Sequence, residues 1–284
     1  MMLRSTPLLA IALLVAGCTA SASSDPARNV ADFAPTGQVE ALRLPFDAYA
    51  FSLSEMYAIS NAEDLLTQQC MRAKGHDWQV IKRPTDLKDL RNRRRYGVIE
   101  IRIAQQFGYH VPEGLLTPAE VEQQYDRRDS GMSETQREAA LGEGGCGHEA
   151  VKQLRPAEAA DPERLQQLGR ESLVNSQDEP RVTAAMDSWR NCMRETGFTY
   201  QDPFAAMSDS KWWADDSAGP SRDEISVAVA DVRCKERTSL IDVWHATEVK
   251  IQEELITRYP DYFQQLGASM RHELTAAHAV LARM

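Results

Sequence analysis

The sequence predicts a mostly α-helical fold with little or no sheet, built as two helical lobes that pack together and end in long C-terminal helices. Apolar residues recur at spacings of three and four along most of the chain, which is the period of a helix buried on one face. Start signals with Ser, Thr or Asp before Pro or Glu are frequent, and so are glycines that fit helix ends. Alternating, strand-like runs are scarce.

The N-terminal residues predict an exported, lipid-anchored protein. One basic residue, Arg4, precedes an apolar run over residues 7–17, which has the length of a signal peptide and about half that of a membrane-spanning helix. The run ends in the segment Val15–Cys18 (VAGC), which resembles the lipobox of bacterial lipoproteins. The resemblance implies cleavage before Cys18 and a lipid with two palmitate-type acyl chains joined to the protein through the Cys18 sulfur, as a thioether. An ordinary secretory signal followed by a chance cysteine is the alternative.

We therefore expect residues 1–17 to be a lipoprotein signal peptide and residues 18–40 to be a lipidated flexible tether, rich in small and polar side chains. Two acyl chains hold a protein on a membrane where a single chain binds only marginally. The predicted location is the outer face of the cytoplasmic membrane. The net charge of −10 argues against nucleic acid as a partner.

Four cysteines besides Cys18 predict two disulfides, because an even number is typical of exported proteins. These are Cys70, Cys146, Cys192 and Cys234. Their spacing fits neither a zinc knuckle nor a C-x-x-C redox pair. Cys70 and Cys192 open the similar stretches CMRAKGHDW and CMRETGFTY, which indicates that the two positions are equivalent.

Because a duplicated unit tends to carry its own disulfide, we expect the pairs Cys70–Cys146 and Cys192–Cys234. The corresponding lobes are residues 41–160 and residues 161–284. Pairings that cross between the repeats are the alternative.

The rest of the repeated pattern predicts how two helices begin and end. Gly75 and Gly197 fit the left-handed position that follows a helix, and the residue after each is expected to fold back onto the last turn. Ser60 and Glu63 have the spacing of a capping box, which places the start of the first of these helices near Ser60.

Other segments are also expected to be helical. Asp161-Pro162 and Ser221–Glu224 carry start signals, the second as a capping box. One helix is expected from residue 224 to residue 259, which contain no Gly or Pro, and Pro260 restarts or kinks it. Residues 98–107 fit a strand or a helix, and we expect a helix because a glycine and an aromatic residue follow.

Several short segments together carry a resemblance that spans most of the mature chain. They are Tyr96-Gly97, Gly108-Tyr109-His110, Trp189, Cys192-Met193, Gly197-Phe198 and Ala230–Lys235. In these residues the chain resembles an uncharacterised family of exported or lipid-anchored proteins from high-GC Gram-positive bacteria. The family has no assigned enzymatic activity, so the resemblance implies architecture and location only.

No catalytic centre, cofactor or metal is expected from the sequence. It contains no G-x-S-x-G serine motif and no G-x-x-x-x-G-K phosphate loop. His245 with Glu248 and His148 with Glu149 lack a third metal ligand. A soft-metal site that combines a cysteine with a nearby methionine is the alternative, but oxidised cysteines cannot act as thiolate ligands.

A basic island in the acidic chain is the first candidate surface site. Its candidate anion-binding residues are Arg91, Arg93, Arg94 and Arg95. They could meet anionic lipid headgroups or an anionic wall polymer. The alternative is a solvated face whose arginines pair with acidic residues of the other lobe.

The adjacent Trp212 and Trp213 form the second candidate site, because exposed aromatic rings beside acidic residues can stack on sugars. Such a pair can equally cover a disulfide or fill a gap between helices.

The function that these features predict is a membrane-anchored extracytoplasmic lipoprotein. We expect a non-catalytic binding or accessory subunit of the cell envelope, whose partner is a cell-wall polymer or a membrane protein complex. The alternative is a cell-wall-modifying hydrolase that uses carboxylates in a groove between the lobes.

Overall fold

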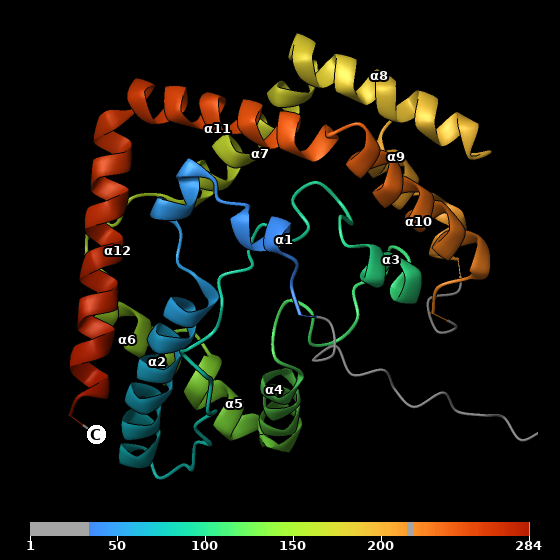
Figure 1. Ribbon diagram of the computed structural model, residues 1–284. Helices are drawn as coiled ribbons and strands as arrows, with labels where there is room; N and C mark the ends of the chain where they lie inside the picture. The colour runs from blue at the N-terminus through green and yellow to red at the C-terminus, as the bar shows by residue number, and fades with distance from the viewer. Residues whose placement is uncertain (1–33, 215–218, 284) are drawn as a thin grey trace, which may run out of the picture.

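The computed structural model describes residues 34–214 and 219–283, and within them the regular structure is entirely helical (Figure 1). This confirms the predicted fold class. The elements are α1 (Gly37–Ala41), η2 (Pro45–Tyr49), α2 (Leu53–Ala73), α3 (Ile101–Phe107), α4 (Ala119–Gly131), α5 (Glu134–Leu141), α6 (Cys146–Leu154), α7 (Pro162–Asp178), α8 (Pro180–Glu195), α9 (Pro203–Met207), η3 (Ser210–Trp212), α10 (Arg222–Arg237), α11 (Leu240–Arg258) and α12 (Pro260–Leu281).

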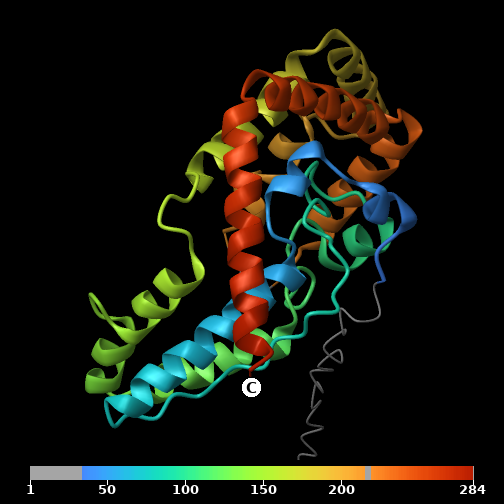
Figure 2. The ribbon, with the colours of Figure 1, turned by 90° about the vertical axis from the view of Figure 1, so that its left-hand side faces the viewer.

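The two long C-terminal helices lie at the periphery of the molecule. α11 crosses one end and α12 runs down one side to the C-terminus, with Pro260 as the first residue of α12 (Figures 1 and 2). A proline is favoured there because its missing N–H is one that the first helical turn leaves unbonded anyway. No helix in residues 34–214 and 219–283 combines the length and the apolar character needed to cross a bilayer.

Both predicted disulfide pairings are confirmed. Cys70–Cys146 joins the end of α2 to the start of α6, and Cys192–Cys234 joins α8 to α10, each with a Cα–Cα distance of 5.6 Å. The first disulfide lies in a small apolar cluster with Met71 and Trp78. The second belongs to the largest cluster of buried side chains, which includes Trp189, Trp244 and Tyr109.

The two repeated stretches end their helices in the same way. The Phe198 N–H donates to Met193 O (2.9 Å) and the Gly197 N–H to Arg194 O (3.0 Å). In the first copy, the His76 N–H donates to Met71 O (2.9 Å) and the Gly75 N–H to Arg72 O (3.0 Å). Gly75 and Gly197 adopt φ of 77° and 91°. This is the Schellman geometry that the sequence predicts, and it needs a glycine because other residues are strained at positive φ.

Two predicted capping boxes are corrected by the structure. The start of α2 lies eight residues earlier than expected, at a box in which Ser52 accepts from the Glu55 N–H and Glu55 accepts from the Ser52 N–H. Ser60 therefore lies inside α2. Ser221 does cap α10, but the Glu224 carboxylate is buried and accepts a hydrogen bond from the Tyr109 N–H instead of returning to Ser221.

The predicted continuous helix over residues 224–259 is also corrected. α10 ends at Arg237 and α11 begins at Leu240, with Ser239 between them in the left-handed region at φ 51°. The break lets α10 pack on α3 and α8 while α11 packs on α7 and α8. A straight helix would carry the apolar side of α11 away from that core.

Helix packing crosses the predicted boundary at residue 160 in both directions. α12 packs along α2 and α6, and α3 packs on α10 (Figures 1 and 2). The first predicted lobe therefore contributes α3 to the core around the second disulfide, and the second contributes α12 to the helices joined by the first disulfide.

Candidate functional site

The predicted basic island does not present its arginines as a free cationic face. Arg93 is 4% exposed and its guanidinium forms a bidentate pair with Glu100, at 2.7 Å from Nε and 3.0 Å from Nη2. Arg91 pairs with Asp89 at 2.9 Å and also donates to the carbonyl of Ala50. These guanidinium groups neutralise carboxylates and carbonyls of the protein itself.

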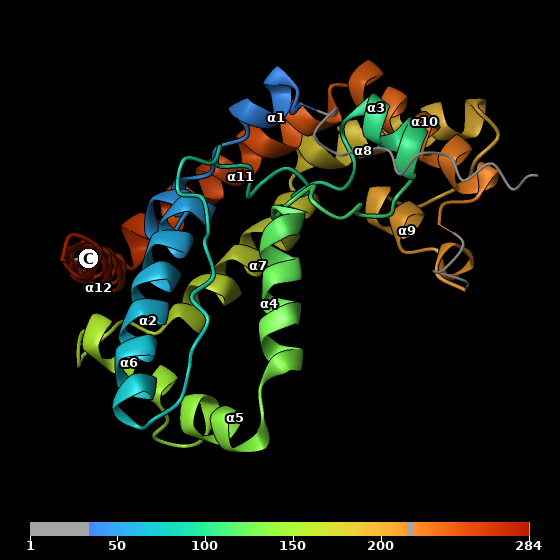
Figure 3. The same ribbon diagram turned by 90° about the horizontal axis from the view of Figure 1, so that it is seen from below.

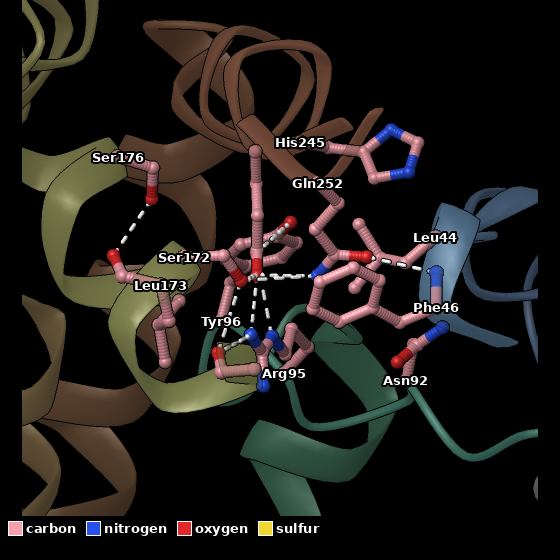
Figure 4. A network of polar contacts seen from close by, with 12 residues as sticks. Leu44, Phe46, Asn92, Arg95, Tyr96, Ser172, Leu173, Ser176, His245 and Gln252 are labelled. Carbon is pink, nitrogen blue, oxygen red and sulfur yellow. Dashed lines mark hydrogen bonds and ion pairs between the residues drawn. The ribbon is translucent and has the colours of Figure 1, made fainter. Parts of the chain in front are cut away.

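Arg95 is held by a buried network that spans distant parts of the chain. Arg95, Tyr96, Ser172 and Gln252 converge on one point (Figure 4), which is the fully buried carboxylate of Glu248. The Tyr96 and Ser172 hydroxyls each donate to it at 2.8 Å. Burial and the adjacent Glu248 charge raise the pKa of Tyr96, so its hydroxyl stays a donor.

Arg94 is likewise directed into the protein. Its Nη2 donates to the Tyr109 carbonyl at 2.7 Å, and its Nη1 is buried without a hydrogen-bond partner in the part of the chain that the structure describes. Burial lowers the pKa of Arg94 from its usual value. The structure therefore favours the alternative in which Arg91, Arg93, Arg94 and Arg95 are paired within the fold, and their contact with an anionic surface stays a prediction.

The two adjacent tryptophans have different environments. Trp212 is 5% exposed and donates from Nε1 to the Ala206 carbonyl at 2.8 Å, so it fills a gap in the core and cannot stack on a ligand. Trp213 is 42% exposed, and its ring centroid lies 4.6 Å from that of His110. Sugar contact by Trp213 stays a prediction.

Cys18, the predicted site of lipid attachment, lies outside the described residues. Within residues 34–214 and 219–283, no three His, Cys, Asp or Glu side chains are grouped so that they could hold a metal ion.

Two short spacings that resemble catalytic motifs occur in other structural contexts. Gly142–Gly147 reads G-x-G-x-x-G, but it joins α5 to α6, and the dinucleotide-binding fingerprint requires a preceding strand. Ser208–Lys211 reads S-x-x-K. Hydrogen bonds to Tyr200 and Asp209 raise the pKa of Lys211, which keeps it charged and unsuited to act as a base.

A cleft of about 560 Å³, lined by charged, polar and apolar side chains, brings together residues that no sequence motif connects. Its walls come from α2, α4, α5 and α6 and from residues 78–83, which run beside α2 (Figure 3). We call it the Asp64 cleft after the residue at its floor. The volume lies within the roughly 300–1,000 Å³ of small-molecule sites.

Asp64 organises the floor of the cleft. The carboxylate is 5% exposed and accepts hydrogen bonds from Trp78 Nε1 (3.0 Å) and the Ile81 N–H (3.1 Å). It also forms ion pairs with Arg83 (2.8 Å) and Arg128 (2.9 Å). A buried charge is tolerated when it is paired and hydrogen-bonded in this way.

Two aromatic rings hold Arg128 in place. Its guanidinium carbon lies 4.4 Å from the Trp78 ring centroid and 5.1 Å from that of Tyr125. The Tyr125 hydroxyl accepts a hydrogen bond from Arg83 at 2.8 Å. The floor is therefore a rigid, internally satisfied layer in which two guanidinium groups share the charge of one carboxylate.

Side chains at the mouth of the cleft make fewer hydrogen bonds and ion pairs than those at its floor. Arg155 is 58% exposed and bonds Glu273 through Nε at 3.3 Å. His148 is exposed, and its Nδ1 lies 2.9 Å from the Gly142 carbonyl oxygen. Because a carbonyl oxygen can only accept a hydrogen bond, Nδ1 is the donor and Nε2 is left toward solvent. Burial raises the pKa of Glu63, and the negative charge of Glu273 adds to this effect while Arg155 opposes it.

Comparisons with known proteins do not assign this chain to a family. No family model, no curated protein and no solved structure matches it. The resemblance to exported proteins of high-GC Gram-positive bacteria stays a prediction from the sequence.

The sequence does not predict the Asp64 cleft. Its pattern places Glu63 in a capping box and Arg83 within the basic island, and no motif connects either residue with Arg128 or Arg155. The one local signal is Trp78, which closes the repeated stretch after Cys70 and packs with the disulfide.

Replacing Glu63 by Gln is expected to raise the melting temperature at pH 7–8 and to leave it unchanged near pH 4. The folded-state pKa lies above the ordinary 4.5, so ionisation of Glu63 weakens the folded state as the pH rises through that range. The Glu63→Gln variant would lack this effect, which we expect to be less than about 1 kcal/mol because the group is partly solvated. Thermal denaturation at both pH values measures it. Glu149→Gln, an exposed neighbour on α6, is the control, and an equal shift at both pH values would contradict the assignment.

Proposed function

We propose that the protein is a lipoprotein on the outer face of the cytoplasmic membrane and that it acts as a non-catalytic binding subunit of the cell envelope. The N-terminal sequence supports the anchor, since an apolar run of signal-peptide length ends in VAGC at Cys18. The Asp64 cleft supports binding, because it is a concave site of small-molecule size lined by polar groups on disulfide-linked helices.

The hydrogen bonds and ion pairs that Asp64 already makes are the observation that favours binding over catalysis. A hydrolase that acts on glycosidic bonds uses two carboxyl groups, one as an acid and one as a nucleophile or base. Asp64 accepts hydrogen bonds from four groups of the protein, so its lone pairs are already directed at Trp78, Ile81, Arg83 and Arg128. It would have to break ion pairs to attack a substrate.

A cell-wall-modifying hydrolase is the second candidate because of Glu63. A carboxyl group with a raised pKa in an open cleft has the property of a general acid. Incubating the protein with purified cell wall and measuring soluble fragments distinguishes the two functions. Release by the unmodified protein and loss of release in Glu63→Gln would establish the hydrolase, and no release by either supports the binding subunit.

The lipid anchor is tested by metabolic labelling with a clickable palmitate analogue in a high-GC Gram-positive host. The full-length protein is expected to be labelled and to fractionate with membranes, and Cys18→Ser is expected to lose the label because the thioether sulfur is gone. Ser21→Ala, three residues further on, is the control and should label normally. A labelled Cys18→Ser protein would overturn the proposed anchor.

A further inference from the structure

We propose that the Asp64 cleft binds an anionic saccharide, in which a sugar ring carries a carboxylate that pairs with Arg155. This inference rests on the binding function proposed above and names the chemistry of the ligand. Two features carry it: the geometry of the accessible arginine, Arg155, and the mixed polarity of the walls.

The cleft contains cationic groups that are able to pair with an anion. The lining includes three arginines and two carboxyl groups, in a chain whose net charge is −10. Arg83 and Arg128 have side chains that are 2% and 10% exposed, and both are held by Asp64. Glu273 pairs with Arg155 and Asp129 pairs with Arg128, so these carboxylates offset the arginine charge around the cleft. An incoming anion therefore depends on the exposed edge of one guanidinium group and not on an excess of positive charge.

Arg155 is the cation that a ligand can reach. Its contact with Glu273 uses Nε, and its terminal nitrogens make no hydrogen bond within the described residues. A guanidinium edge with two free N–H groups matches a carboxylate in a bidentate pair. A phosphate group favours several cations or a ring of backbone N–H groups. With one accessible arginine, a single carboxylate is the better fit.

The other groups at the mouth suit the rest of a sugar. Glu63 and the Nε2 atom of His148 can bond ring hydroxyls, as can the hydroxyl of Ser60 on the next turn of α2. Leu141 lines the same cleft and is 49% exposed, which gives the apolar C–H face of a sugar ring a surface to cover. A simple inorganic anion would use none of this apolar wall.

Isothermal titration of the full-length protein in detergent micelles tests the proposal. The probes are methyl glucuronide, methyl glucoside, glucose 1-phosphate and acetate, which separate the carboxylate, the ring and the phosphate. We expect methyl glucuronide to bind at least about tenfold more tightly than each of the other three, because a charge-assisted pair and the ring contacts must act together. Equal affinity for the glucoside and the glucuronide would overturn the proposal, and so would tighter binding of the phosphate.

Matched variants locate the binding. Arg155→Gln is expected to abolish the preference for the glucuronide, whereas Arg237→Gln should keep it, since Arg237 is 55% exposed and pairs with Glu195 outside the cleft. Leu141→Glu should weaken glucuronide binding about tenfold, and Val174→Glu, at a position 57% exposed on α7, should not. Because all four positions are exposed, circular dichroism should show unchanged folding. Undiminished preference in Arg155→Gln would contradict the assigned pair, whatever the outcome of the palmitate labelling.

Discussion

Replacing Asp231 by Leu is expected to lower the free energy of unfolding by about 3–5 kcal/mol, the scale found when one partner of a buried ion pair is removed. Asp231 is 0% exposed and Lys235, one turn later on α10, is 2% exposed. The Lys235 ammonium donates to Asp231 at 2.9 Å and to the Val98 carbonyl at 2.8 Å. Without the carboxylate, the ammonium group would be buried with no opposite charge.

The surroundings of this pair explain why the loss is large. Trp189 donates from Nε1 to Asp231 at 3.0 Å and would lose its acceptor in the variant. Burial raises the pKa of Asp231 and lowers that of Lys235, and each charge opposes the effect of burial on the other. Removing either group therefore leaves its partner with the full unfavourable effect of desolvation.

The double variant Asp231→Leu with Lys235→Met distinguishes a buried charge from a simple packing defect. Replacing both partners with apolar side chains of similar volume is often neutral, so the double variant should be more stable than either single variant. Full recovery is not expected, because Trp189 Nε1 and the Val98 carbonyl lose partners. Urea denaturation followed by tryptophan fluorescence measures all three. A double variant less stable than both singles would show that volume, and not charge, sets the effect.

The features that the sequence predicts correctly are those that depend on a few neighbouring residues. Both helix endings at Gly75 and Gly197 follow from the need for a residue that tolerates positive φ. The disulfide pairing follows from the similarity of two short stretches, which is also local information. Pro260 begins α12 for the same kind of reason.

The start of α2 shows how local signals become ambiguous. Ser52-x-x-Glu55 and Ser60-x-x-Glu63 have the same spacing, and nothing in either segment distinguishes a helix start from a helix interior. The break before α11 has no local signal at all. Ser239 adopts a left-handed conformation there without the glycine that usually marks one.

Interactions between distant segments are what the sequence could not supply. A run of arginines suggests a charged surface, but Arg95 pairs with Glu248, 153 residues later. The Asp64 cleft likewise joins residues from α2, α4 and α6 whose proximity depends on tertiary packing. In both cases the partner of a charged side chain lies on another element, and charge patterning along the chain carries no information about it.

Removing either disulfide is expected to lower the free energy of unfolding by about 4 kcal/mol, the entropic scale for loops of this length. The bonds close sequence separations of 76 residues for Cys70–Cys146 and 42 residues for Cys192–Cys234. Chemical denaturation of the two double Cys→Ser variants measures the losses. Because the estimate grows only slowly with loop length, the two losses should be similar.

The two variants should differ in their effect on the Asp64 cleft. Cys70–Cys146 joins α2 and α6, and both helices line the cleft, whereas α8 and α10 do not. At a temperature where both variants remain folded, Cys70→Ser with Cys146→Ser should weaken methyl glucuronide binding, and Cys192→Ser with Cys234→Ser should leave it unchanged. Equal weakening in both would indicate that general loss of stability, and not the link between α2 and α6, is responsible.

The same difference should appear in the native protein under mild reduction. Cys70 is half-buried although its partner Cys146 is 0% exposed, while Cys192 and Cys234 are both buried, at 4% and 1%. A thiolate must reach a sulfur atom to open a disulfide, so the Cys70–Cys146 bond should be reduced first. Limited treatment with dithiothreitol, alkylation and peptide mapping would then label Cys70 and Cys146 while the second pair stays intact. Earlier labelling of Cys192 and Cys234 would mean that the core around α8 and α10 opens more readily than its burial indicates.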